Sequence, residues 1–282
     1  MTKKTGPELR MPAALAASLT CPVCALPLDQ GLTCARGHSF DVAREGYASL
    51  LTGATPPGSG DTREMVAARQ RFQERGHYDP LARALAEELA GRRVIVDVGG
   101  GTGHYLTRIL DELPDAVGLT TDVSKFAARR AARAHPRGGA VTADSWRRLP
   151  LADHTADAVT NVFAPRNAAE FRRILRPGGV LLVVTPAPDH LTEPRAALGL
   201  LDVDPRKDER LAQSLEGHFT PVATRELRFT MDLEHEDVRT VVGMGPSARH
   251  VTPEELAGRV AELPEPFATT ASVRLGTYLR SP

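Results

Sequence analysis

The sequence has little of what marks membrane-bound, secreted or strongly charged proteins. Its 282 residues carry 35 Lys and Arg against 35 Asp and Glu, so no net charge draws the whole chain to nucleic acid or to a membrane. It contains no apolar run of membrane-spanning length and no N-terminal signal peptide. We therefore expect a cytoplasmic globular protein with no membrane partner.

Cysteine is scarce, and all three cysteines lie in the stretch CPVCALPLDQGLTCARGHSF. Thiols stay reduced in the cytoplasm, so an odd and clustered set favours metal binding over disulfides. Cys21-x2-Cys24 and Cys34-x3-His38 supply four donors, which suit a closed tetrahedral zinc site without catalytic chemistry. The alternative is that the cysteines are merely buried and that His38 is an ordinary surface residue.

The chain is long enough for one large core and a small additional module. Zinc binding can supply roughly 10–16 kcal/mol, enough to order a short segment that buries little core of its own. The Gly/Pro/Ser-rich residues 52–61 are typical of an exposed linker. We predict a zinc-binding module over residues 15–51, a linker over 52–61 and a larger domain over 62–282.

Strand and helix patterns alternate through the larger domain. Two helices are expected over residues 62–92, and strands and helices then alternate up to residue 188. This alternation predicts an α/β fold with a parallel sheet covered on both faces. Beyond it we expect a strand over 226–234, helices over 235–246 and 252–263, and an edge or closing strand over 269–279.

A glycine-rich loop follows the first strand of this domain and opens a helix. It reads DVGGGTGH and contains Asp97, Gly99, Gly101 and Gly103. Its spacing differs from the Gly-x-Gly-x-x-Gly of dinucleotide sites, and its aspartate would repel a phosphate but suit an amino group. The loop resembles motif I of the class I S-adenosylmethionine-dependent methyltransferases. The alternative is that the glycines only form a tight turn.

Three later marks follow the order of that superfamily. Asp122 ends the next strand, where a carboxylate can accept both ribose hydroxyls of a nucleoside. By resemblance, Asp144 contacts the adenine, and Asn161 and Pro165 of NVFAP border the place where methyl donor and acceptor meet. The aspartates could instead cap helices, and the last two residues could simply end a strand.

The whole pattern resembles the RlmA-type 23S ribosomal RNA (guanine-N1-)methyltransferases, nearest to their tylosin-resistance branch. The resemblance is carried by the cysteine box together with GHSFDVAREGYASLL, DVGGGTGHYL, NVFAPRNAAEFRRILRPGG, TPAPDHLTE and GMGPSARH. It implies a class I (Rossmann-like) methyltransferase sheet with a small N-terminal zinc-binding module.

The resemblance also implies an activity and its partners. The expected reaction moves a methyl group from S-adenosylmethionine to N1 of a guanine in a 23S rRNA hairpin loop, and macrolide resistance is a possible purpose. We expect a homodimer whose zinc module helps to grip the RNA, and GMGPS (243–247) beside the guanine. Arg249 stands where some members carry tryptophan, which leaves the base contacts and the target loop open.

The sequence leaves the proton acceptor and the RNA contacts open. Asp144, His104 or a water held by carbonyls of NVFAP could take the guanine N1 proton. Phe163 and Tyr47 could stack on bases or belong to the core. Two arginine clusters could contact phosphates or be plain solvated helix faces: Arg69, Arg71 and Arg75, and Arg129, Arg130, Arg133 and Arg137.

Two rival functions remain at this level. A small-molecule methyltransferase of the quinone type would share the glycine loop but would need no zinc box. A catalytically silent RNA- or protein-binding module of the same fold would keep the architecture without binding the cofactor.

Overall fold

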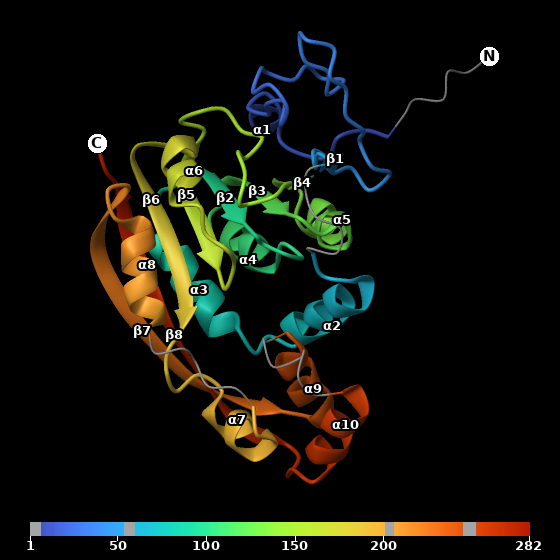
Figure 1. Cartoon of the computed structure of the whole chain (residues 1–282), viewed down its shortest axis with the longest axis vertical. Helices are drawn as coiled ribbons and strands as arrows, with labels where there is room; N and C mark the ends of the chain where they lie inside the picture. Colours follow the sequence, from blue (N-terminus) through green and yellow to red (C-terminus); the bar gives the residue numbers. More distant parts are fainter. Residues whose placement is uncertain (1–6, 54–59, 201–205, 245–251) are drawn as a thin grey trace, which may run out of the picture.

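The computed structural model describes residues 7–53, 60–200, 206–244 and 252–282 (Figure 1). The helices are α1 (Ala13–Ala16), α2 (Arg63–Glu74), α3 (Asp79–Glu88), α4 (His104–Glu112), α5 (Lys125–Ala134), α6 (Ala168–Ile174), α7 (Thr192–Leu198), α8 (Lys207–Leu215), α9 (His235–Gly243) and α10 (Pro253–Ala261). The strands are β1 (Ala48–Ser49), β2 (Val94–Val98), β3 (Val117–Asp122), β4 (Gly138–Thr142), β5 (Ala156–Val162), β6 (Leu175–Pro186), β7 (Phe219–Leu233) and β8 (Phe267–Arg280).

All eight strands belong to one sheet with the order β1-β4-β3-β2-β5-β6-β8-β7. Strands β1 to β6 run parallel, whereas β8 is antiparallel to both β6 and β7. This arrangement confirms the predicted α/β, Rossmann-like methyltransferase sheet. Because the carboxyl ends of parallel strands share one edge, the loops after β2, β3, β4 and β5 converge there.

The C-terminal strands differ from the prediction. Residues 269–279 form part of β8, which is an inner strand between β6 and β7, and β7 is the edge. Strand β7 begins at Phe219, seven residues before the expected start, and most of its side chains are exposed. The alternating pattern identified both strands, but a pattern within one strand carries no information about which neighbour it pairs with.

Local sequence accounts for several helix starts. The Thr62 hydroxyl accepts a hydrogen bond from Met65 N at 3.3 Å at the start of α2, and Ser124 does the same for Ala127 N at 3.4 Å at the start of α5. Such caps satisfy backbone N–H groups that have no partner within the helix. The connection from β4 to β5, residues 143–155, contains no helix, so something else must cover that part of the sheet.

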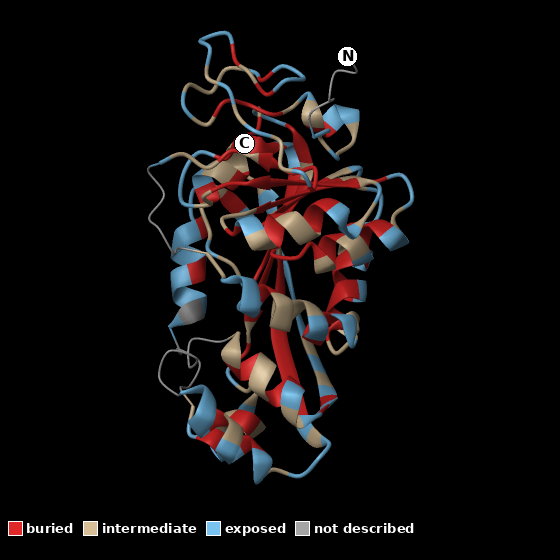
Figure 2. Ribbon diagram, turned by 90° about the vertical axis from the view of Figure 1, so that its right-hand side faces the viewer, coloured by how far each residue is buried: buried red, intermediate tan, exposed pale blue. Residues whose placement is uncertain are grey.

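The N-terminal segment covers it. Leu15 and Leu19 are fully buried in the same apolar cluster as Leu119 of β3 and Leu151 of the β4–β5 connection. On the opposite face, α3 and α4 pack against β2 and β6. Figure 2 shows the strands between these two layers as the most buried part of the molecule.

Backbone hydrogen bonds also join the N-terminal segment to the larger domain. Thr20 N donates to Pro150 O at 3.0 Å, Ala152 N donates to Ser18 O at 2.9 Å, and β1 pairs with β4. The division into a module over 15–51, a linker over 52–61 and a domain over 62–282 stays a prediction, and residues 54–59 of the linker lie outside the described residues. Within the described ranges, no helix combines the length and apolar character needed to cross a bilayer.

Candidate active site and metal centre

The glycine loop lies directly against the acceptor turn. Gly99, Gly101 and Gly103 have φ angles of 72°, 59° and 77°, in the left-handed region that favours glycine. A Cβ atom added to Gly99 would lie 2.6 Å from the Cβ of Ala164, inside the NVFAP turn after β5. The structure therefore brings together the predicted cofactor loop and the predicted acceptor turn.

Asp97 lies beneath this loop and is completely buried. Its Oδ1 accepts a hydrogen bond from Thr160 Oγ1 at 2.8 Å, while Oδ2 is buried without a hydrogen-bond partner. Burial, opposed by the hydrogen bond from Thr160 and aided by the nearby Asp122 carboxylate, raises the pKa of Asp97 to about 7. An amino group at Oδ2 would satisfy the free oxygen, which fits the methionyl part of S-adenosylmethionine.

Asp122 is oriented by backbone groups at the end of β3. Its Oδ2 accepts from Gly101 N at 2.9 Å and its Oδ1 from Ser124 N at 2.8 Å. Burial raises the pKa of this carboxyl too. Each oxygen keeps a second lone pair, so the carboxylate can also accept ribose hydroxyls. An ion pair between Arg69 and Asp61, 2.8 Å long, lies nearby.

Asn161 shapes the acceptor turn. Its buried Nδ2 donates to Val98 O at 3.2 Å and to Pro165 O at 2.9 Å, while its Oδ1 is buried without a partner. Asn161 thus ties β5 to β2 and closes the turn, whose far end, Pro165, is exposed. Between them Phe163 has φ 54° and is 43% exposed. Its ring stacks on His190, with centroids 6.0 Å apart.

His190 was missed by the sequence reasoning, although it lies in the TPAPDHLTE stretch that helped to carry the resemblance. Its Nδ1 accepts a hydrogen bond from Ser272 N at 3.1 Å. Tyr47, by contrast, is buried with alanines of α5 and belongs to the core. Residues 245–251, which include Arg249 and most of GMGPS, lie outside the described residues.

Asp144 follows β4 at the same edge of the sheet. Its Oδ1 accepts from Trp146 N at 3.0 Å, and its Oδ2 lies 3.4 Å from Arg147 Nε. Trp146 is the single tryptophan of the chain and is 68% exposed. The sequence stretch TADSW contained it, but nothing in the pattern indicated an exposed aromatic ring beside the predicted adenine contact.

The arginines predicted as phosphate contacts fall into different settings. Arg71 and Arg75 pair with acidic residues of α9 and its cap, which fixes α2 to α9. Arg137 donates to three backbone carbonyls, at Leu110, Leu113 and Ala116, and is part of the fold. The remaining cluster of α5 lines a cavity of about 830 Å³ together with His104.

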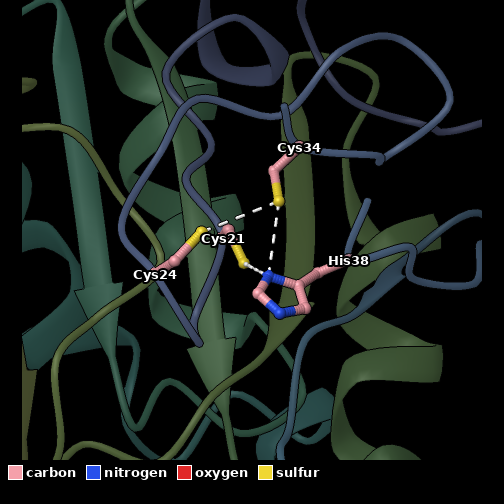
Figure 3. Close-up of side chains that lie close together, drawn as sticks. All are labelled: Cys21, Cys24, Cys34 and His38. Carbon is pink, nitrogen blue, oxygen red and sulfur yellow. Dashed lines mark hydrogen bonds between the residues drawn. The ribbon is translucent and has the colours of Figure 1, made fainter. Parts of the chain in front are cut away.

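The four predicted metal ligands converge at the end of the molecule that holds the N-terminal segment (Figures 1 and 3). Their ligand atoms all lie within 4.8 Å of one another. His38 Nδ1 is 3.5 Å from Cys21 Sγ and 3.4 Å from Cys34 Sγ, and Cys24 Sγ is 3.6 Å from Cys34 Sγ. These separations suit the corners of a tetrahedron around zinc.

The thiol chemistry of the cluster also fits a metal. Burial opposes ionisation of Cys34, but backbone hydrogen bonds at Arg36 and His38 and the side chains of Cys24 and His38 outweigh it and lower its pKa to about 6. Burial raises the pKa of Cys21 instead. A thiolate already favoured at Cys34 is the form that binds zinc, and a cation would stabilise the other thiolates.

Comparisons with known proteins agree with this geometry. The family model described as "RlmA, N-terminal" matches residues 19–53, which hold all four ligands. The model described as "Methyltransferase domain" matches residues 95–179, which run from the glycine loop through the acceptor turn.

Two curated relatives match almost the full chain. One, from Micromonospora griseorubida, is a "Putative 23S rRNA (guanine-N(1)-)-methyltransferase", 52% identical over 92% of this chain and 96% of its own. The other, from Streptomyces fradiae, is a "23S rRNA (guanine(748)-N(1))-methyltransferase", 53% identical over 90% and 94%. The chain belongs to the 23S rRNA (guanine-N1-)methyltransferase family.

A solved structure supports the fold independently. It is described as "Conversion of a Disulfide Bond into a Thioacetal Group during Echinomycin Biosynthesis" and has a TM-score of 0.50 and 18% identity over 72% of this chain and 82% of its own. Family and fold together confirm an enzyme that uses S-adenosylmethionine, and the zinc ribbon with its Cys3His cluster confirms zinc as the metal.

Proposed function

We propose that this protein transfers a methyl group from S-adenosylmethionine to N1 of a guanine in a hairpin loop of 23S rRNA. The observation that carries this proposal is the pairing of the Cys3His cluster with the methyltransferase edge in one chain, which is over 50% identical along nine-tenths of its length to relatives named as 23S rRNA (guanine-N1-)methyltransferases. A methyltransferase that acts on small molecules would need only the methyltransferase edge and no zinc cluster.

Six residues of the edge are proposed to hold the cofactor: Asp97, Gly99, Gly101, Gly103, Asp122 and Asp144. Asp97 offers its free Oδ2 to the amino group, and Asp122 offers both oxygens to the ribose. Asp144 follows β4, at the same edge of the sheet as Asp97 and Asp122, and would bind the adenine. The proposed zinc ligands are Cys21, Cys24, Cys34 and His38, and zinc supplies structural order there with no part in the transfer.

The transfer itself is an in-line displacement at the sulfonium methyl carbon. Positioning supplies most of the rate, and no covalent enzyme intermediate is needed. Asn161 and Pro165 border the meeting point of donor and acceptor, and neither side chain can accept the guanine N1 proton. Their proposed role is therefore to position the acceptor. The exposed Phe163 ring on the same turn offers an apolar surface for a base splayed out of its loop.

The partners and setting are also proposals. We place the enzyme in the cytoplasm, where ribosomal RNA is found, and expect a homodimer. Methylation that protects ribosomes from tylosin-type macrolides would be its purpose. The name of the Streptomyces fradiae relative gives guanine 748 of 23S rRNA as its target, which supports an rRNA partner for this protein.

A primer-extension assay tests the activity. Purified protein is incubated with tritiated S-adenosylmethionine and unmodified 23S rRNA or its hairpin fragments, and primer-extension stops are mapped, since N1 methylation blocks base pairing. A new stop at one loop guanine is expected. Cofactor binding without any stop at a loop guanine would contradict the proposal. Methylation without RNA would favour a small-molecule enzyme, and absence of cofactor binding would favour a silent module.

A further inference from the structure

The cavity lined by the arginines of α5 lies where α2 and α5 pack together, and Figure 1 shows both helices on the same side of the molecule. Its volume is about 830 Å³, and it is walled by α2, α4 and α5. Thr102 of the glycine loop belongs to the wall, and its Oγ1 donates to Gln73 Oε1 of α2 at 2.7 Å. The cavity therefore adjoins the cofactor loop without including Asp97 or Asp122.

Positive charge dominates this cavity. Two carboxylates, Glu74 and Asp111, line it against five arginines: Arg63, Arg108, Arg129, Arg130 and Arg133. Acids from outside the cavity neutralise two of these arginines, since Asp79 binds Arg108 through both carboxylate oxygens and Glu45 lies 3.2 Å from Arg129.

The other three arginines have no ion pair with any residue that the structure describes. Arg130 contacts only neutral acceptors, Gln70 Oε1 and the backbone carbonyl of Phe126. Arg63 lies over the Phe126 ring, 5.2 Å from its centroid, and Arg133 is exposed. Three guanidinium groups around one cavity that form no ion pair with a carboxylate favour an anionic ligand.

An unpaired buried atom in the same wall points to a ligand independently. His104 Nε2 is buried without a hydrogen-bond partner, and Arg129 Nε, which forms an ion pair with Glu45 Oε1 at 3.2 Å, is buried without a hydrogen bond of good geometry. Buried polar atoms are seldom left without a partner, because each costs part of its hydration. Burial lowers the pKa of His104 to about 4, with help from the Arg108 charge, so its ring is neutral at neutral pH. With its proton on Nε2, the neutral His104 ring can donate a hydrogen bond to an incoming oxyanion.

We infer that this cavity binds the phosphodiester backbone of the RNA beside the methylated loop. The inference depends on the proposed rRNA substrate and assigns the phosphate contacts to one surface. Arg130 and Arg133 lie one turn apart on α5, and from Phe126 to Arg133 the helix advances roughly 10 Å. That length exceeds a single phosphate group and suits successive phosphates of one strand. The Phe126 ring adds an apolar surface to the same cavity wall.

The test compares alanine variants of the unpaired arginines with a matched control. Arg133→Ala and Arg130→Ala remove cavity charges, whereas Arg83→Ala removes an exposed arginine of α3 outside the cavity. Affinity for a fluorescent 23S rRNA hairpin fragment is measured by anisotropy at several salt concentrations, S-adenosylmethionine affinity by equilibrium dialysis, and folding by thermal melting.

Each cavity variant should weaken RNA binding about tenfold, as expected when one charge-assisted hydrogen bond is removed. A plot of log affinity against log salt should become less steep, with the magnitude of its negative slope smaller by about 0.7–0.9 for each phosphate that the variant no longer neutralises. KM for RNA should rise while kcat at saturating RNA and cofactor affinity match the wild type. The melting temperature should match for the exposed Arg133→Ala, whereas Arg130→Ala also loses its hydrogen bond to Gln70 and should melt at a slightly lower temperature. The Arg83→Ala variant should behave as the wild type throughout.

Three results would overturn the inference. Cavity variants that bind RNA like the Arg83→Ala control, while the wild type methylates the hairpin, would leave the proposed function standing and remove this surface from it. Inorganic phosphate that saturates the cavity without competing with RNA would make it a small-anion site. A wild type that binds the cofactor but neither binds nor methylates the hairpin would remove both proposals together.

Discussion

Gly99 and Ala164 approach so closely that a Cβ atom on the glycine would lie 2.6 Å from the Cβ of the alanine. This contact joins the cofactor loop after β2 to the acceptor turn after β5, two segments more than 60 residues apart in the chain. The relative position of methyl donor and acceptor therefore depends on the absence of a side chain at Gly99.

Gly99→Ala should separate these two segments and weaken cofactor binding. The positive φ costs about 1–2 kcal/mol with alanine, and the forced displacement of Ala164 adds about 1–3 kcal/mol. Urea unfolding and equilibrium dialysis with S-adenosylmethionine measure the two effects. Gly91→Ala is the matched control, because Gly91 has φ 78° but nothing within 4 Å of an added Cβ. Equal destabilisation of both variants would mean that only backbone strain matters at Gly99.

Asp97 should make cofactor binding depend on pH. Its pKa is raised to about 7 in the folded chain, above its value of 3.8 when unfolded, so its contribution to stability is present at low pH and is lost as pH rises through 7. A cofactor ammonium group favours the charged carboxylate. Affinity for S-adenosylmethionine should therefore rise from about pH 6 to about pH 8 with release of a proton.

Calorimetry in buffers of different ionisation enthalpy measures that proton release. Asp97→Asn should abolish it and should remove the loss of stability between about pH 4 and pH 7, whereas Asp115→Asn, at an exposed carboxylate, should change neither. Unchanged proton release in Asp97→Asn would show that another group binds the cofactor amine.

Local motifs predicted which strand ends and loops lie together better than they predicted the packing around them. Asp97, Asp122 and Asn161 each lie at the carboxyl end of a short strand rich in β-branched residues, and parallel strands bring such ends together whatever covers the sheet. The spacing of Cys21, Cys24, Cys34 and His38 likewise determined one cluster. The inner position of β8 and the packing of Leu15 and Leu19 on the sheet depend on contacts between distant segments, for which a single sequence contains no signal. The same holds for His190 beside Phe163.

Cys24→Ser should remove the zinc and unfold residues 20–50 while cofactor binding persists. The module pairs with β4 through β1, but Asp97 and Asp122 lie on β2 and β3, which it does not pair with. Metal analysis should give about one zinc per chain for the wild type, since the four ligands form one closed site. Hydrogen exchange should show reduced protection confined to the N-terminal segment.

Val23→Ala serves as the control, because Val23 lies between two ligands and is 58% exposed. It should keep its zinc and its exchange pattern. Simultaneous loss of zinc and cofactor binding in Cys24→Ser would show that the chain folds as one unit and that the division at residues 52–61 is wrong.

Trp146 should report directly on the adenine site. Its backbone N–H holds the Asp144 carboxylate at 3.0 Å, and its ring is 68% exposed, so adenine bound at Asp144 would lie close to the only indole in the chain. Stacking on the ring, or a change in its exposure to water, would alter its fluorescence. Titration with S-adenosylmethionine should therefore change the tryptophan emission, with a midpoint equal to the dissociation constant from dialysis.

Asp144→Ala should weaken cofactor binding about tenfold, as expected when a hydrogen bond to a charged group is removed, and shift the fluorescence midpoint by the same factor. Asp153→Ala, at an exposed carboxylate on the same β4–β5 connection, is the control and should leave the midpoint unchanged. If saturating cofactor leaves the emission of the wild type unaltered while dialysis shows binding, the adenine does not lie at Asp144, and the group that binds it has to be sought on another strand end.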